Sequence, residues 1–374
     1  MRRLANTIRL VLLCAVAAFV AMICAQAAAS QEMPKIANAK EEVRGVAQSL
    51  EATVAQIAGE SQAPTWIAYS VEQVAHGGSV CCENHYQHGD GGCGICRLEN
   101  GSESSSHTDK QEGGTVALEG SAQLVVLLRV AEKRVMRLRI ASSNCTLDAG
   151  GLRLVWLKDV KAAESVALLK RYVLTKDFAG DGDDDHRMSD EALTAIALHA
   201  DATADRTLSE WAAPGQPEEL RKRVSFWLGA TRGKSGLVTL QHMAKSDPSS
   251  DVRAQVAFAL SISKQPGALD EIIRMAHDDQ SAHVRGQALF WLAQKAGQKA
   301  SSTITGAIES DPDTEVKKKA VFALSQMPKD EGIPKLIQVA QTNHNPEVRK
   351  QAMFWLGESH DPRALAFFEK VLAQ

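Results

Sequence analysis

The sequence lacks a strong excess of charge of either sign, and beyond its first thirty residues it lacks long hydrophobic runs. Its formal net charge is −3 over 374 residues, which gives no global attraction to nucleic acid or to an anionic membrane. After residue 30 the longest strongly apolar run is Leu124 to Leu128, far short of the roughly 18 residues that a membrane-spanning helix needs. We therefore expect no nucleic-acid partner and no membrane span in the mature protein.

The first thirty residues have the pattern of a secretory signal peptide. Three arginines among the first nine residues precede an apolar run from Leu10 to Ile23, and Ala25-Gln26-Ala27 fits a small-residue cleavage site. A retained anchor and a lipoprotein are the alternatives, but a lipoprotein needs a small residue before Cys24, where Ile23 stands. We predict that residues 1–29 are removed and that the protein is exported, to the periplasm or out of the cell.

Residues 31–62 are expected to form a single N-terminal helix, centred on residues 34–58. Ile36, Val43, Leu50 and Ile57 recur every seven residues, which puts them on one apolar stripe of a helix. A stripe of this kind either packs against the chain's own next domain or pairs in a coiled coil. We favour packing against the next domain.

Residues 63–175 have the composition of a small β-rich domain with a closing helix. Several runs are rich in the β-branched and aromatic residues that favour strands, and Ala131 to Arg134 separates two of them as the turn of a hairpin. In the second strand of that hairpin arginines are interleaved with apolar residues, which predicts one buried face and one basic, solvated face. The expected elements are the strands Thr65–Val74, Gln123–Val130, Val135–Ala141 and Leu152–Leu157, a long loop Gly89–Gly114, and a helix Ala162–Leu174.

An acidic linker is expected over residues 176–189, between the β-rich domain and the region that follows. Its segment Ala179 to Asp185 reads AGDGDDD and bears a faint likeness to a calcium-binding loop. That alternative is weak, because His186 stands where such a loop has a glycine and no glutamate closes the loop.

Five cysteines remain once the signal peptide is gone. Export places them in an oxidising compartment, where cysteines tend to pair, and an odd number leaves one without a partner in the chain. We favour disulfides that staple the β-rich domain. Zinc and a redox-active Cys93-Gly94-Ile95-Cys96 pair stay open as alternatives, since two spacings suit tetrahedral zinc. The cysteines are Cys81, Cys82, Cys93, Cys96 and Cys145, and the zinc alternative uses Cys82, His85, His88, Cys93 and Cys96.

Residues 190–374 carry a repeat with a period of about 32 residues, in the range that is typical of solenoids. Each copy has an aliphatic residue followed by a basic one, a leucine eight positions later, and in most copies an aspartate five positions earlier. A period of this size over five copies predicts a solenoid of helical hairpins that share one continuous core. A weaker, earlier copy is expected from about Asp190. The aliphatic positions are Leu220, Val252, Val284, Val316 and Val348.

This pattern resembles the HEAT repeat, in the short bacterial form first described in phycobilisome lyases. The segments DPSSDVRAQVAFAL, Asp247 to Leu260, and DPDTEVKKKAVFAL, Asp311 to Leu324, carry the resemblance. It implies an armadillo-type α-solenoid, so the expected fold class is an α+β multidomain chain with the solenoid preceded by a small β-rich, cysteine-containing domain. It also implies a ladder of aspartate and arginine side chains between copies, from which Lys317 and Asn343 depart.

A ladder of five phenylalanines departs from the same family pattern, which often has polar residues at that position. Each Phe lies six residues after the aliphatic position, about 240° around a helix from the core stripe. The next residue alternates Trp and Ala, with Trp291 expected in the core. The Phe side chains either wedge between neighbouring first helices or form a docking strip for a partner protein. They are Phe226, Phe258, Phe290, Phe322 and Phe354.

No catalytic pattern emerges from the sequence. The HEAT-type hydroxylase needs His-Glu dipeptides, and this chain has none; it also has no nucleophile elbow, phosphate loop or dinucleotide fingerprint. The histidines of the solenoid are expected at the surface or in local caps. We predict a non-enzymatic scaffold without a cofactor that binds a protein through the solenoid. The alternative is a metal- or thiol-dependent enzyme with its site in the Cys81 to Cys96 loop and the solenoid recruiting its substrate.

Overall fold

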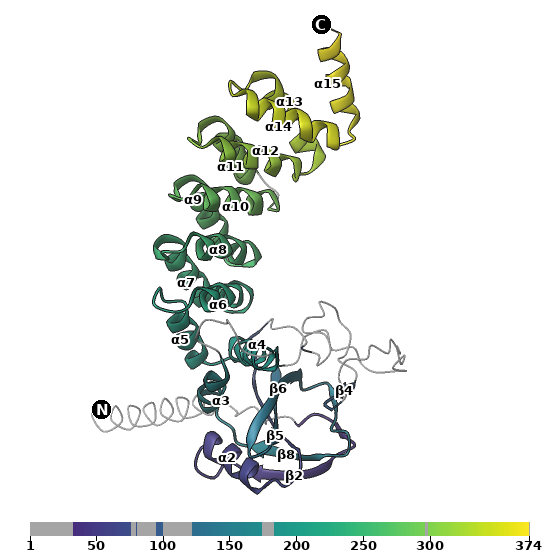
Figure 1. The fold of residues 1–374 in the computed structure, drawn as a ribbon, viewed down its shortest axis with the longest axis vertical. Helices are drawn as coiled ribbons and strands as arrows, with labels where there is room; N and C mark the ends of the chain where they lie inside the picture. The colour runs from purple at the N-terminus through teal and green to yellow at the C-terminus, as the bar shows by residue number, and fades with distance from the viewer. Residues whose placement is uncertain are drawn as a thin grey trace, which may run out of the picture.

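The computed structural model describes residues 33–75, 80, 95–99, 122–173, 183–295 and 298–373, with the backbone alone at 183–185 and 298. A β-rich domain comes first, and a stack of helical hairpins rises from it (Figure 1). The expected fold class, an α-solenoid preceded by a domain with β-sheets, is confirmed. Among the described residues no helix has the length and apolar character needed to cross a membrane.

Two sheets build the β-rich domain. In the five-stranded sheet, the first three strands in spatial order are parallel to one another and the last two are antiparallel to their neighbours. Its spatial order is β2 (Lys40–Gly45), β8 (Arg153–Lys158), β3 (Thr65–Glu72), β5 (Gln123–Ala131), β6 (Arg134–Ser142). The second sheet is small and parallel, in the order β1 (Ile36–Ala37), β7 (Thr146–Asp148), β4 (Ile95–Arg97).

The predicted hairpin is confirmed as β5 and β6. Glu132 and Lys133 form its turn, both with positive φ, at 52° and 63°, as the two-residue turns that match strand twist require. The pairing slips by one residue after Arg129. This bulge is why Val135 and Leu138, an odd number of residues apart, both pack on the same core.

The basic face expected on β6 is covered in part, which corrects the prediction of a fully solvated face. Arg137 and Arg139 are half-buried, and Arg139 donates to the carbonyl oxygen of Arg97 in β4 at 3.0 Å. The five-stranded sheet is buried on both faces, because one contacts helices and the other contacts the small sheet. Its central strands are accordingly apolar along their whole length rather than alternating.

The single N-terminal helix predicted over residues 34–58 is wrong in its first half. Residues 36–45 form β1 and β2, and only Leu50–Glu60 is helical, as α2. Ser49 starts this helix, since its hydroxyl accepts the backbone N–H of Ala52 at 3.1 Å. The heptad spacing was coincidental for Val43, which is 47% exposed on the edge strand β2. The part that is helical packs on its own domain, through Leu50, Val54 and Ile57.

The connection to the solenoid is shorter than predicted. The expected closing helix is present as α3 (Ala162–Leu169) and a 3-10 turn η1 (Lys170–Tyr172). Helix α4 (Asp183–Leu198) already begins within the predicted linker 176–189. Its first residues are aspartates, which the dipole at a helix N-terminus favours. The first part of the acidic segment lies outside the described residues.

The solenoid consists of helical hairpins in which first and second helices alternate. In Figure 1 the first helices α8, α10 and α12 lie on one side of the stack and the second helices α7, α9 and α11 on the other. Their inward residues form one apolar cluster that continues into the β-rich domain. After α4 come α5 (Ala202–Trp211), α6 (Glu218–Thr231), α7 (Gly233–Ser246), α8 (Ser250–Ile262), α9 (Ala268–Asp278), α10 (Ala282–Ala293), α11 (Gln298–Ser310), α12 (Thr314–Ser325), α13 (Lys329–Thr342), α14 (Pro346–Glu358) and α15 (Pro362–Leu372).

Candidate functional site

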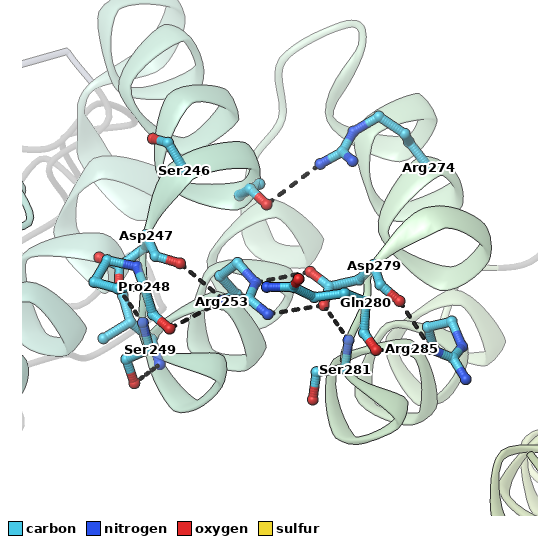
Figure 2. A network of polar contacts seen from close by, with 12 residues as sticks. Ser246, Asp247, Pro248, Ser249, Arg253, Arg274, Asp279, Gln280, Ser281 and Arg285 are labelled. Atoms are coloured by element: carbon cyan, nitrogen blue, oxygen red, sulfur yellow. Dashed lines mark hydrogen bonds and ion pairs between the residues drawn. The ribbon is translucent and has the colours of Figure 1, made fainter.

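An ion-pair ladder runs along the turns between copies and fixes how neighbouring copies stack (Figure 2). The guanidinium of Arg253 donates two hydrogen bonds to the carboxylate of Asp279 in the next copy, at 2.8 and 2.9 Å. Its remaining nitrogen donates to the carbonyl oxygen of Asp247, which ends the preceding second helix, at 2.8 Å. Both partners are buried, and the carboxylate raises the pKa of Arg253. The ladder implied by the repeat resemblance is therefore present.

The ladder has three such rungs and then stops. Arg221 pairs with Asp247 and Arg285 with Asp311 in the same two-bond manner. At the next step Lys317 instead donates to the carbonyl oxygen of Glu309 at 2.8 Å. The ion pair is lost there because Asn343 carries no charge to attract it. The two departures noted in the sequence therefore change the electrostatics of the last two copies.

Eight aromatic rings form a continuous strip along the first helices, and we call this set the aromatic strip. Each ring touches the next, with centroids 4.7 to 6.2 Å apart. The strip crosses five copies, from α6 to α14. In order of contact its members are Trp227, Phe226, Phe258, Trp291, Phe290, Phe322, Trp355 and Phe354.

The alternation of Trp and Ala in the sequence sets two kinds of contact between copies. From a Trp-bearing copy to the next, Phe stacks on Phe, as for Phe290 and Phe322 at 6.0 Å and 6°. From an Ala-bearing copy to the next, Phe meets the Trp of the following copy, as for Phe322 and Trp355 at 4.9 Å. The small Ala323 beside Phe322 leaves its ring free to tilt toward that Trp. The structural unit is thus a pair of copies rather than a single one.

Apart from Trp227, which is buried in the core, the strip is neither core nor fully exposed surface. Four of the five phenylalanines are half-buried, and the last, Phe354, is 54% exposed. Trp291, which was expected in the core, is also half-buried at its edge. Ring contacts between copies match the packing interpretation, while the exposed parts of the rings leave the docking interpretation open. The docking role stays a prediction.

Two open grooves adjoin the strip on the first helices. One of about 410 Å³ lies between α4, α6 and α8, with Phe226 and Trp227 in its wall. The other, of about 460 Å³, lies between α6, α8 and α10, with Phe258 and Trp291. Both share Lys222 and Gln255, so they form one continuous path across four first helices, from α4 to α10.

Amide side chains line this path. Gln255 and Gln287 occupy the same position in neighbouring copies, and both line the second groove. Neither amide has a hydrogen-bond partner in the part of the chain that the structure describes. Each can therefore both donate to and accept from a ligand.

The basic side chains at the N-terminal end of the strip are already paired with carboxylates. Lys222 contacts the carboxylates of Glu218 and Glu219 at 2.8 and 3.0 Å, which raise its pKa. Arg223 pairs with Asp190. The second groove also contains the carboxylate of Asp251, whose ion-pair partner is His283 at 3.8 Å. The two grooves therefore present apolar and amide surface with a small excess of negative charge.

Two lysines without a carboxylate partner among the described residues lie at the C-terminal end of the strip. Lys319 and Lys350 are exposed, and neither has a carboxylate within ion-pair distance among the residues described. A Cβ at Gly286 would lie 2.3 Å from Cδ of Lys319, so this lysine lies flat across α10 next to the strip. Lys317 and Arg349 lack the aspartate that the arginines of the first three rungs have, and each donates to a backbone carbonyl oxygen instead.

His199 is an exception to the expectation that the histidines lie at the surface. It is fully buried where β3 meets α4, and its Nε2 lies 2.8 Å from the hydroxyl of Ser165. That hydroxyl also lies 2.9 Å from the hydroxyl of Tyr69. Burial lowers the pKa of His199 to about 4. The network joins the two domains but has no access to solvent, so it is structural. The other solenoid histidines are exposed: His242, His277, His283, His344 and His360.

The cysteine site falls mostly outside the described residues. This holds for Cys81, Cys82, His85, His88 and Cys93. Cys96 and Cys145 are described, and both are buried in the core between the two sheets, with 2% and 1% exposure. Within the described ranges no group of three or more His, Cys, Asp or Glu side chains could hold a metal. The disulfide, zinc and redox hypotheses all stay predictions.

Comparison with known families agrees with the fold. The helical part of the chain is an α-solenoid repeat scaffold. The family model for HEAT repeats matches residues 206–293 and 301–374, so this part of the chain consists of HEAT repeats. A search of the curated proteins finds no match to its sequence.

Several solved structures match part of the chain at low identity. The phycocyanin lyase complex of CpcE and CpcF from Nostoc sp. PCC7120 is 20% identical, with a TM-score of 0.32, over 41% of this chain and 99% of that one. Human deoxyhypusine hydroxylase is 14% identical, with a TM-score of 0.26, over 56% and 90%. A mutant of Kap121p is 15% identical, with a TM-score of 0.36, over 56% and 27%. Likenesses this weak say nothing about activity or partners.

Proposed function

We propose that this protein is an exported scaffold that binds another protein through the first helices of its HEAT repeats and has no catalytic activity of its own. The proposal rests on one observation above all: the aromatic strip crosses five copies and keeps part of each Phe ring exposed. Aromatic side chains are enriched where proteins bind proteins. Packing between copies does not by itself account for the open grooves and the unpaired amides beside the strip.

Site-specific photo-crosslinking in cells tests this function. A photoreactive amino acid at Gln255 or Gln287 lies in the grooves, whereas the same group at Lys234 or Lys245 lies exposed on the second helix α7. We expect a discrete crosslinked protein from the two groove positions and none from the two α7 positions. The same products from both sides, or none from the grooves, would overturn the proposal.

Export is the second part of the proposal. It is supported by the basic, apolar and small-residue order of the first 27 residues and by the five cysteines that follow them, since cysteines pair readily in an oxidising compartment. The mass of the protein recovered from the periplasm or the medium, before and after reduction, tests it. We expect a chain that lacks about 29 residues and gains mass as disulfides are reduced.

The same sample separates the scaffold from the enzyme alternative. A thiol-dependent or zinc-dependent site in the Cys81 to Cys96 loop requires free thiols or bound metal in the purified protein. Metal analysis and thiol titration of the unreduced chain measure both. Stoichiometric zinc together with four free thiols would replace the disulfide proposal with a metal site.

A further inference from the structure

The spacing of the copies restricts the conformation of a ligand that follows the strip. Packed helices lie about 8–10 Å apart, so the two grooves, which are displaced from each other by one first helix, lie about that distance apart. A β-strand presents the same face every two residues, or about 6.7 Å, which is shorter than the spacing of the helices. A polyproline II helix presents the same face every three residues, or about 9.3 Å. An α-helix does so every seven residues, or about 10.5 Å. The last two conformations fit.

The unpaired amides distinguish between these two. An α-helix satisfies its own backbone groups, so it offers the amides of Gln255 and Gln287 nothing but side chains. A polyproline II segment has no internal hydrogen bonds and leaves its carbonyl oxygens free to accept. The amides of Gln255 and Gln287, on two neighbouring copies beside aromatic walls, therefore match a polyproline II backbone, whose rings and apolar side chains dock in aromatic-lined grooves.

The distribution of charge along the strip indicates which end of the ligand is acidic. The grooves over α4 to α10 contain carboxylates, among them that of Asp251, whereas Lys319 and Lys350, over α12 and α14, have no carboxylate within ion-pair distance among the described residues. Exposed ammonium groups beside aromatic rings favour carboxylates in a partner and disfavour cations. The end of the ligand that lies over α12 and α14 is thus expected to be acidic.

We propose that the aromatic strip binds a polyproline II segment of the partner protein, apolar at every third residue and acidic at the end that lies over α12 and α14. This inference rests on the proposed function and names the kind of segment that the scaffold recognises. Proline rings at positions i and i+3 occupy the two grooves, and the amides of Gln255 and Gln287 donate to the carbonyl oxygens between them.

Fluorescence anisotropy with the full mature protein and labelled 18-residue peptides tests the proposal. Two probes have proline at every third residue, with four glutamates at the N-terminal or the C-terminal end. A third has lysines in place of the glutamates, and a fourth is a helix-forming peptide with leucine at every seventh residue. We expect one of the two glutamate peptides to bind at least tenfold more tightly than the lysine and helical peptides. Its affinity is also expected to fall as salt rises.

Two double variants locate the binding on the strip. Gln255→Ala with Gln287→Ala removes two hydrogen-bond donors. We expect the affinity for the peptide to fall about tenfold and its salt dependence to stay unchanged. Lys319→Ala with Lys350→Ala is expected to lower the affinity for the peptide about fivefold and to reduce its dependence on salt. Lys234→Ala with Lys245→Ala, on α7, is the matched control and should bind as the parent does. All these side chains are at least partly exposed, so circular dichroism is expected to show folded proteins.

The possible failures point to different conclusions. Tighter binding of the helical peptide would overturn the polyproline II assignment, and equal binding of the glutamate and lysine peptides would overturn the charge assignment. Binding that survives both strip variants would place the peptide elsewhere on the molecule. If no peptide binds while photo-crosslinks still form at Gln255 and Gln287, the segment proposed is wrong and the scaffold function stands. If those crosslinks are also absent, both proposals fail.

Discussion

Arg253 and Asp279 lie in neighbouring copies and are joined by two hydrogen bonds, of 2.8 and 2.9 Å, between a buried guanidinium and a buried carboxylate. The same carboxylate accepts the backbone N–H of Ser281 at 2.8 Å and so also starts the next first helix. One side chain therefore ties together the end of α9, the start of α10 and the arginine of α8. The orientation of successive copies, and with it the course of the aromatic strip, depends on this joint.

Replacing Asp279 by Ala should destabilise the solenoid strongly. Arg253 would keep its buried charge without a partner, which typically costs about 3–5 kcal/mol. Urea denaturation followed by circular dichroism measures the loss. The matched control is Asn343→Ala, at the same position of a rung that has no ion pair, and we expect a smaller loss there. Equal losses at the two positions would mean that the ion pair itself contributes little.

Completing the fourth rung should stabilise the last two copies. Lys317→Arg with Asn343→Asp recreates the residue types of the rung formed by Arg285 and Asp311. We expect a gain of roughly 1 kcal/mol, because the new pair must offset the cost of taking two charges out of water. Each single variant alone should gain less than the pair, and the double-mutant cycle measures the coupling. A cycle without coupling would mean that α12 and α14 are not placed as the earlier copies are.

The repeats could be predicted from the sequence because their signal is periodic and local. Each copy repeats the same core positions, and neighbouring copies contact only one another, so a constant spacing along the chain suffices to define the stack. The position of the Phe ladder away from the core stripe also followed from the helix wheel. The ring contacts did not, since the sequence shows the alternation of Trp and Ala but not the distances and angles between rings of neighbouring copies.

The β-rich domain was predictable in composition but not in topology. Strand β2 pairs with β8, whose register joins Lys40 to Arg153, and no local pattern indicates a contact that distant in the sequence. Because of such pairings, residues 36–45 form strands although Ile36 and Val43 have the seven-residue spacing of a helix. His199 was assigned to the surface because one histidine carries no periodic signal. Its burial follows from the packing of α4 on the sheet, which is a tertiary feature.

Two phenylalanines of the strip should respond very differently to truncation. Phe290 contacts both Trp291 and Phe322 and is half-buried, so Phe290→Ala should cost about 2–3 kcal/mol, somewhat below a fully buried Phe. Phe354 is 54% exposed, and Phe354→Ala should cost about 1 kcal/mol or less. Thermal unfolding of both variants measures the difference. Similar large losses would show that the strip serves packing along its whole length.

His199 makes stability depend on pH between about 4 and its ordinary value. The folded chain keeps His199 neutral, because burial lowers its pKa to about 4, whereas the unfolded chain protonates it near pH 6.5. Below pH 6.5 the unfolded state binds the proton first, so the free energy of unfolding falls as the pH falls, by about 3 kcal/mol in total. Urea midpoints between pH 7 and 4 measure this loss. His199→Gln should flatten the dependence over this window, and His242→Gln, at an exposed site, should leave it unchanged.

A close approach between α6 and α8 makes Gly229 indispensable. A Cβ at this position would lie 2.2 Å from the carbonyl oxygen of Ala259, a backbone atom that can move only if the two first helices separate. Gly229→Ala should therefore destabilise the protein by about 2 kcal/mol, within the range of other overpacking substitutions. Gly357, in α14, is the matched control, because a Cβ there has nothing within 4 Å. Gly357→Ala should stabilise the protein by up to about 1 kcal/mol through helix propensity. Since both changes add the same methyl group to a first helix, opposite signs in the measured free energy of unfolding would isolate the helix contact as the cause.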